Sequence, residues 1–224
     1  MKFSLPEYCI WDFNGTILDD VETGIRSVNV LLRQRGLPVL EDKAAYRRVF
    51  GFPIRDYYER LGFDFEREPY EVVAPLWVEQ YLKHVVDAPL YEDVIETLEL
   101  LRRRGVRQTV ISATELGMLR QQLRQLGIDG YFEEILGLDN IHAASKMALA
   151  QEWRVRHPRA REIFLGDTDH DRETAAAMGA ECYLIARGHQ SADYLETLGV
   201  QVFPSLRALF GETEGSNKNE DRNL

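Results

Sequence analysis

The chain is poor in cysteine, in long apolar runs and in clustered basic residues. Each of these scarcities excludes a class of protein. Cysteine occurs twice in 224 residues, and both Cys9 and Cys182 lie in apolar runs. We therefore expect two reduced, buried thiols rather than a disulfide framework. No apolar run approaches the length that crosses a bilayer. No long basic run offsets the net charge of −10, so we expect neither nucleic-acid nor membrane partners.

We expect no secretory signal peptide in the first residues of the sequence. Residues 1–7 lack both the apolar core and the cleavage site of a secretory peptide. Together with the two unpaired thiols, this predicts a cytoplasmic protein. The hydrophobic content of 45% is ordinary for a globular chain. A chain of this length can bury one substantial core, with or without an insert.

Short apolar runs alternate with helical patterns over most of the chain. This alternation predicts an α/β fold, with a three-layer, doubly wound and mostly parallel sheet of Rossmann-like type. The expected strands cover residues 8–13, 106–112, 134–138, 162–166, 182–185 and 200–203. The expected helices cover residues 91–104, 115–126, 145–156 and 173–178.

Residues 19–87 break this rhythm, because they carry helical periods and many aromatic residues but no convincing strand. We expect a small helical insert here, with the sheet-containing core made of residues 1–18 and 88–210. An insert at this point would stand over the carboxyl ends of the strands, where open α/β sheets bind ligands. Residues 211–224 are polar and lack a hydrophobic period, so we expect a disordered tail.

The first expected strand ends in a carboxylate, Asp12, which a glycine turn follows. A charge at the edge of a buried sheet is costly unless it meets a cation or hydrogen-bond donors. Gly15 allows the backbone to approach a ligand closely, and Thr16 adds a hydroxyl beside it. Asp12 is therefore a candidate nucleophile on phosphorus, which would form an aspartyl phosphate. Gly15 and Thr16 are candidate phosphate-binding residues.

Two later segments offer further phosphate ligands. Ser112 and Ala113 end the second strand, where we expect a helix to begin and its free backbone N–H groups to bind phosphate. Lys146 opens the helix after the third strand. Ser112 and Lys146 would hold the phosphoryl oxygens as charge redistributes in the transition state.

A last segment supplies carboxylates for a metal ion. Asp167 ends the fourth strand, and Asp171 follows four residues later. Attack of one anion on another requires neutralisation of charge, and clustered carboxylates suit Mg²⁺. Asp12, the backbone carbonyl of Asn14 and Asp167 would form the metal site, with Asp171 supporting it directly or through water.

In this order, the motifs resemble those of the haloacid dehalogenase-like hydrolase superfamily, in particular its phosphoglycolate-phosphatase-like branch. The resemblance covers almost the whole chain: the loop from Asp12 to Thr16, the strand-end Ser112, Lys146, the Gly-Asp-x-x-x-Asp motif and a helical cap inserted after the first motif. It implies a Mg²⁺-dependent phosphohydrolase whose substrate is a small phosphorylated metabolite. It also implies that Asp12 is the nucleophile, assisted by Ser112 and Lys146.

The chain departs from this family at Asn14, where the family has an aspartate as general acid/base. An amide neither donates nor accepts a proton at neutral pH, and general acid–base catalysis contributes about 10²–10⁴-fold to a rate. We therefore expect slow or selective hydrolysis, in which acyl phosphates and anhydrides suffer least. The alternative is a catalytically silent phosphate- or metabolite-binding protein that keeps the fold and the metal.

Several other side chains keep two interpretations. His170 either replaces the missing base or is a loop residue without a catalytic role. Residues 50–55 resemble the loop that family members point at the substrate, but their aromatic side chains could equally pack the core of the cap. Arg47, Arg48 and Arg55 either face solvent, or one of them meets an anion on the substrate. The sequence does not predict the oligomeric state.

Overall fold

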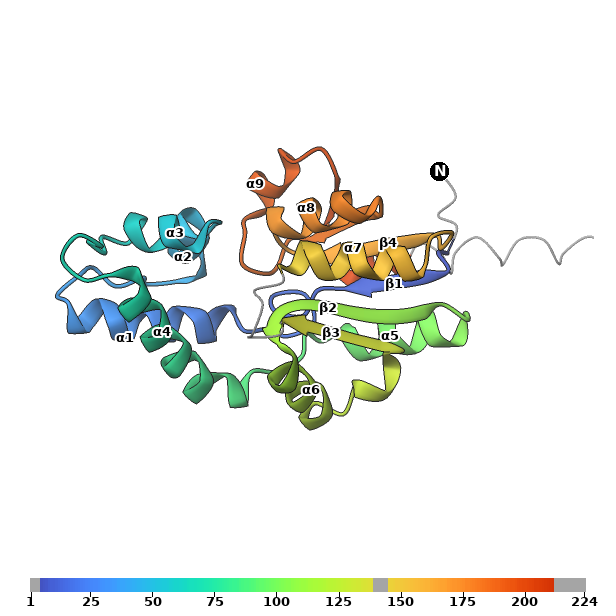
Figure 1. Ribbon diagram of the computed structural model, residues 1–224, viewed down its shortest axis with the longest axis horizontal. Helices are drawn as coiled ribbons and strands as arrows, with labels where there is room; N and C mark the ends of the chain where they lie inside the picture. The colour runs from blue at the N-terminus through green and yellow to red at the C-terminus, as the bar shows by residue number, and fades with distance from the viewer. Residues whose placement is uncertain (1–4, 139–144, 212–224) are drawn as a thin grey trace, which may run out of the picture.

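A six-stranded parallel sheet runs through the molecule in the computed structural model, which describes residues 5–138 and 145–211 (Figure 1). The strand order is β3-β2-β1-β4-β5-β6, and each neighbouring pair is parallel. Because the order reverses on either side of β1, the sheet is doubly wound and the carboxyl end of β1 is its switch point. The strands are β1 (Tyr8–Trp11), β2 (Arg107–Glu115), β3 (Glu134–Leu138), β4 (Glu162–Gly166), β5 (Glu181–Ile185) and β6 (Gln201–Phe203).

Helices cover both faces of the sheet, as Figure 1 shows. Alternate residues of the buried strands point to opposite faces and so build two hydrophobic cores. One core packs against α5 (Val94–Arg103), α6 (Leu116–Gln125) and α10 (Leu206–Phe210). The other packs against α7 (Lys146–Arg156), α8 (Asp169–Met178) and α9 (Ala192–Glu196). The three-layer α/β fold expected from the sequence is confirmed.

Four further helices lie between β1 and α5 and pack on one another. They are α1 (Val21–Gln34), α2 (Lys43–Val49), α3 (Ile54–Arg60) and α4 (Tyr70–His84), and we call them the cap. The cap has a hydrophobic core of its own, rich in tyrosine and phenylalanine. The short helix η1 (Val85–Asp87) follows α4, and η2 (Asp129–Tyr131) precedes β3. The division of the chain into two domains at residues 19–87 stays a prediction.

The chain leaves the sheet for the cap and returns to it at adjacent points. The backbone N–H of Asp19 donates to the carbonyl of Pro89 at 2.9 Å. Leu18 forms an antiparallel bridge with Leu90. Both connections therefore emerge beside the carboxyl end of β1, and the cap extends from that edge of the sheet (Figure 1).

The end of β2 differs from the expectation. The strand continues past its expected end at Ser112 to Glu115, whereas α6 begins at Leu116, within one residue of the expected helix start. The register between β2 and β3 shifts between Ile111 and Glu115, which bends this end of the strand. The Glu115 carboxylate then caps α6 by accepting from two backbone N–H groups of its first turn.

Both cysteines are buried free thiols, as expected. Burial raises the pKa of the Cys182 thiol to about 12 and also raises that of Cys9. Neither thiol is therefore poised for thiolate chemistry. Across the described residues, no helix combines the length and the apolar character needed to cross a membrane.

Candidate active site

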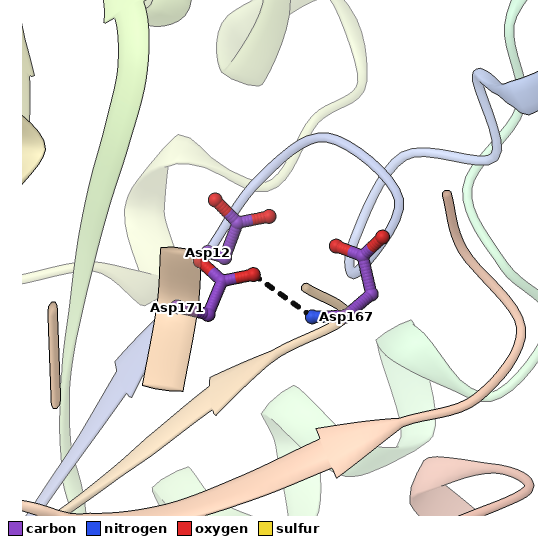
Figure 2. Close-up of side chains that lie close together, drawn as sticks. All are labelled: Asp12, Asp167 and Asp171. Carbon is purple, nitrogen blue, oxygen red and sulfur yellow. Dashed lines mark hydrogen bonds between the residues drawn. The ribbon is translucent and has the colours of Figure 1, made fainter. Parts of the chain in front are cut away.

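Three buried carboxylates meet at the carboxyl ends of β1 and β4 (Figure 2). Asp12 directly follows β1, Asp167 directly follows β4, and Asp171 lies in the first turn of α8. One oxygen of each carboxylate lies within 4.8 Å of the other two. Hard divalent cations such as Mg²⁺ prefer oxygen ligands of this kind. The structure thus brings together the three carboxylates that the sequence motifs single out.

Lys146, the first residue of α7, joins two of these carboxylates. Its Nζ donates to Oδ1 of Asp12 and to Oδ1 of Asp171, and its side chain is only 3% exposed. Burial opposes the ammonium charge, yet the two carboxylates raise the pKa of Lys146 above its ordinary value. Burial in turn raises the pKa of Asp12, against the opposing effect of Lys146. A protonated lysine therefore lies beside Asp12, where it can bind a phosphoryl oxygen.

Asp171 organises the loop that follows β4. Its Oδ2 accepts from the backbone N–H of Asp167 at 3.0 Å, which Figure 2 draws as a dashed line, and from the N–H and hydroxyl of Thr168 at 2.9 and 2.7 Å. Thr168 and Asp171 form a capping box, so α8 begins at Asp169, earlier than the sequence predicts. Oδ2 thus accepts from three donors and Oδ1 from Lys146, so Asp171 would support a metal ion through water or by sharing Oδ1 with the lysine.

The loops around Asp167 hold its carboxylate in place. The Thr16 hydroxyl donates to Oδ1 at 3.1 Å, and the backbone N–H of His189 donates to Oδ2 at 2.7 Å. Gly15 and Gly188 pack against the same group, and a Cβ on either would overlap it. Burial raises the pKa of Asp167 to about 7. A bound cation would stabilise its ionised form, so this donor set fits Mg²⁺.

Ser112 and Ala113 line the same cavity as Asp12 and Lys146. The Ser112 hydroxyl accepts from the backbone N–H of Thr114 and donates to the Thr114 hydroxyl, both at 3.1 Å. These contacts orient a hydroxyl at the cavity wall, whereas two backbone N–H groups in the first turn of α6 are bonded to the Glu115 carboxylate. Ser112 therefore remains placed to bind phosphate through its side chain.

Gly15 and Thr16 are not among the described residues that line this cavity. The N–H of Gly15 donates to the Asp20 carboxylate at 2.9 Å, and the Thr16 hydroxyl is bonded to Asp167. Gly15 has a positive φ of 78°, which lets the turn bring these groups together without a clashing side chain. In the structure both residues hold carboxylates of the site instead of facing the cavity.

Asn14 lies within a hydrogen-bond network that spans the cap and the core. Its Nδ2 donates to Oδ2 of Asp20 at 2.9 Å and to the hydroxyl of Tyr81 on α4 at 2.7 Å. Its Oδ1 accepts from the hydroxyl of Thr114 at 2.8 Å. The Tyr81 hydroxyl also donates to Asp20, at 2.6 Å. The surroundings of position 14 therefore match an amide, which supplies donors that a carboxylate lacks.

Sequence reasoning missed Asp20 and assigned no role to His189. Nε2 of His189 lies 3.3 Å from Asp20, and its Nδ1 lies 2.8 Å from the hydroxyl of Tyr46 on α2. Burial opposes the charge of the imidazole, yet Asp20 raises the pKa of His189 to about 9. The position of His189 in the loop after β5 is the signal that could have found it, because loops at the carboxyl ends of parallel strands converge.

A cavity of about 420 Å³ lies over the carboxylates, with the cap forming its far wall. Phe52 from the cap stacks on His170 from the core, with 4.9 Å between ring centroids. Phe50 also packs within the cap, so residues 50–55 both face the cavity and fill the cap core. The cap side chains along the cavity are mostly aromatic or aliphatic: Tyr46, Phe50, Phe52, Ile54, Tyr57, Tyr58, Trp77, Val78 and Tyr81.

The cap arginines named above do not line this cavity. Arg47 donates to the carbonyls of Arg187 and Gly188, and Arg55 pairs with Glu59 at 3.3 Å. The hypothesis that one of these arginines meets a substrate anion finds no support in their contacts.

Comparisons with known proteins identify the family to which this fold belongs. A family model described as haloacid dehalogenase-like hydrolase matches residues 9–185. Tyrosine-protein kinase PtkA of Mycobacterium tuberculosis is 26% identical over 200 residues, which cover 88% of this chain and 68% of that protein. Phosphoglycolate phosphatase of Chromobacterium violaceum is 29% identical over 203 residues, covering 86% and 89%. A solved structure of M. tuberculosis PtkA has a TM-score of 0.77 at 24% identity, covering 94% of this chain and 99% of that one. The matched range contains every motif described above.

Proposed function

The chain belongs to the haloacid dehalogenase-like hydrolase family, and from this premise we propose that it is a cytoplasmic, Mg²⁺-dependent phosphatase of a small phosphorylated metabolite. We further propose that residues 19–87 form a cap domain over a core of residues 1–18 and 88–210. One observation carries the proposal: a buried carboxylate, Asp12, lies between a protonated lysine and an acidic metal-binding set.

In this proposal, Asp12, Asp167 and the backbone carbonyl of Asn14 would hold Mg²⁺, with Asp171 supporting it, and the ion would supply positive charge to offset that of the phosphoryl group. Asp12 attacks phosphorus, and the bond to the leaving oxygen breaks with its electron pair. Lys146 and Ser112 bind phosphoryl oxygens during this step. Water then attacks the aspartyl phosphate, which releases inorganic phosphate and restores Asp12.

Asn14 limits the first step, because its amide cannot protonate the leaving oxygen. We therefore expect the fastest turnover with leaving groups that depart without a proton. Acetyl phosphate meets this condition, and because it is small, its binding should depend little on contacts with the cap. It is the substrate of choice for testing the reaction itself.

The test compares wild type with Asp12→Asn, using acetyl phosphate with Mg²⁺ or with a chelator. We expect phosphate release that requires Mg²⁺ and falls at least about 10³-fold in Asp12→Asn, because the nucleophile is lost. Asp56→Asn, an exposed change on α3, serves as the matched control. Equal rates in wild type and Asp12→Asn would contradict the proposal. Phosphate binding without turnover would favour the silent binding protein.

The similarity to a protein named a tyrosine-protein kinase supports a second candidate function, phosphoryl transfer from Asp12 to an acceptor other than water. Asn14 favours this possibility, since an amide does not activate water against the aspartyl phosphate. After loading with labelled acetyl phosphate, the protein label should decay faster when a tyrosine-containing peptide is added, and the label should appear on that peptide. Decay at one rate with and without the peptide identifies a hydrolase.

A further inference from the structure

We propose that this site acts on aryl phosphates, monoesters whose leaving group is an uncharged phenol. The proposal rests on the hydrolase function proposed above and specifies its substrate class. Three features of the described residues lead to it: the aromatic wall of the cavity, the charges along its lining, and the amide at position 14.

The wall that faces the leaving group is aromatic and continues down to the reacting loop. Phe50 and Phe52 meet edge to face at 5.7 Å, and Trp77 stacks on Tyr81 at 5.0 Å. The Tyr81 hydroxyl binds Asn14, two residues after Asp12. Aromatic side chains arranged in this way favour a flat, apolar group through stacked and edge-to-face contacts. A volume of about 420 Å³ is enough for one or two fused rings beside a phosphate.

Among the described residues, the lining offers no free cation to a second anionic group. Lys146 supplies its only lysine or arginine side chain among the described residues, and that ammonium is already bonded to Asp12 and Asp171. Of the two histidines, His189 is bonded to Asp20 and Tyr46, and His170 lies stacked on Phe52. The lining carboxylates are Asp12, Asp20, Glu115, Asp167 and Asp171.

This charge balance acts against anionic leaving groups. A carboxylate or second phosphate beside the scissile bond would be buried among these acids without a partner, which is strongly unfavourable. An uncharged leaving group avoids that cost, and an aromatic one also gains contact with the cap wall.

Asn14 adds a requirement on the leaving oxygen. Asp12 attacks phosphorus, and the phosphorus–oxygen bond to the aryl group breaks, with the electron pair going to a phenolate that takes a proton from water. A phenol has a pKa of about 10, whereas an alkyl alcohol resembles water at about 16. Water then displaces Asp12 from phosphorus, so the net products are a phenol and inorganic phosphate. A phenol leaving group therefore fits the aromatic wall and can depart without protonation by an acid at position 14.

The test measures kcat/KM with Mg²⁺ for phenyl phosphate, 2-naphthyl phosphate, 2-phosphoglycolate and acetyl phosphate. We expect both aryl phosphates to exceed 2-phosphoglycolate by at least about 100-fold. If acetyl phosphate turns over with Asp12 but phenyl phosphate is no better than 2-phosphoglycolate, the aryl proposal is overturned while the hydrolase function stands.

Two changes at Phe52 separate recognition by the cap from leaving-group reactivity. Phe52 is 39% exposed, so the fold should tolerate its replacement. Phe52→Leu should lower kcat/KM for phenyl phosphate at least fivefold more than for acetyl phosphate. Phe52→Arg should lower the KM for 2-phosphoglycolate, because it adds a cation to the wall. Phe65→Leu, a cap aromatic outside the cavity lining, is the matched control and should leave the substrate ratio unchanged. An unchanged ratio in Phe52→Leu contradicts the proposal.

A binding measurement covers the case in which no substrate turns over and the hydrolase function itself fails. With Mg²⁺ present, phenylphosphonate and phosphonoacetate are titrated calorimetrically into wild type. Both lack the ester bond, so they report recognition alone. We expect phenylphosphonate to bind at least tenfold more tightly, and equal affinities overturn the aryl preference.

Discussion

Asn14 is held as an amide by its neighbours, and this has consequences for any attempt to restore an acid there. Its Nδ2 donates to Asp20 and to Tyr81, so an aspartate at position 14 would place two carboxylates about 2.9 Å apart. Such a pair must share a proton or separate. Asn14→Asp, which would restore the residue typical of the family, therefore disturbs the network around Asp20.

We predict that Asn14→Asp lowers the free energy of unfolding by about 1–3 kcal/mol, because buried partners lose their donors. The double variant Asn14→Asp/Asp20→Asn returns one donor to the pair and should recover most of that loss. Denaturant unfolding at pH 7 measures both. A single variant as stable as wild type would show that the network tolerates two acids.

Residues that follow strands are predictable from local sequence, whereas their cross-chain partners are not. Asp12 and Asp167 each stand where an apolar run ends, Lys146 opens a helix, and the structure brings the three to one site. Asp20 lies in the insert in sequence terms, and its contact with His189 joins distant parts of the chain. No periodicity or motif records such a pairing, because it depends on how the cap sits on the core.

At the scale of elements, the bend at the end of β2 depends on a glycine in the neighbouring strand. A Cβ on Gly137 would lie 2.6 Å from the carbonyl oxygen of Thr114 and 2.8 Å from the Cα of Leu116. The close approach of these backbones leaves no space for a side chain. This contact between strands leaves no mark on the hydrophobic pattern of β2, so the sequence does not predict where β2 ends. By contrast, β3 and β4 have the bounds expected from their own apolar runs.

We predict that Gly137→Ala displaces the segment after Ser112 and lowers kcat at least about tenfold. It should also lower stability by about 1–3 kcal/mol, as overpacking does. Gly130→Ala is the control, since its Cβ would meet nothing within 4 Å. Turnover of acetyl phosphate and denaturant unfolding measure the two effects. Matching losses in the two variants would argue against a specific role for the bend.

A second element-scale contact ties the cap to the core. Arg47 on α2 donates to the carbonyl of Gly188 at 2.8 Å and to that of Arg187. We predict that Arg47→Leu raises the KM for phenyl phosphate about tenfold, because hydrogen bonds to a charged donor are worth about 1.5–3 kcal/mol. Hydrogen exchange should speed up in α2, and the exposed neighbour Arg48→Leu should change neither quantity. Unchanged kinetics in Arg47→Leu would mean that other contacts hold the cap.

At the scale of the whole molecule, metal binding and folding are linked. An ion that binds the native state alone at 100 times its Kd adds about 2.7 kcal/mol. For a chain of this size, that raises the Tm by about 5–10 °C. We predict such a shift with saturating Mg²⁺ in wild type, and its loss in Asp167→Asn, which removes a charged ligand with little change in shape. Thermal unfolding with Mg²⁺ or a chelator measures it, and a shift of equal size in Asp167→Asn would place the metal elsewhere.

The central position of β1 has a consequence for biosynthesis. This strand is synthesised before the other strands of its sheet, and its neighbours β2 and β4 both come much later in the chain. Its four apolar residues are fully covered only when both neighbouring strands are present. An unfinished chain therefore exposes an unpaired strand edge that favours aggregation. The Asp12–Lys146 pair spans 134 positions, so catalytic geometry arises late in synthesis. Chaperone dependence and slow, non-local folding are the expected costs of this chain order.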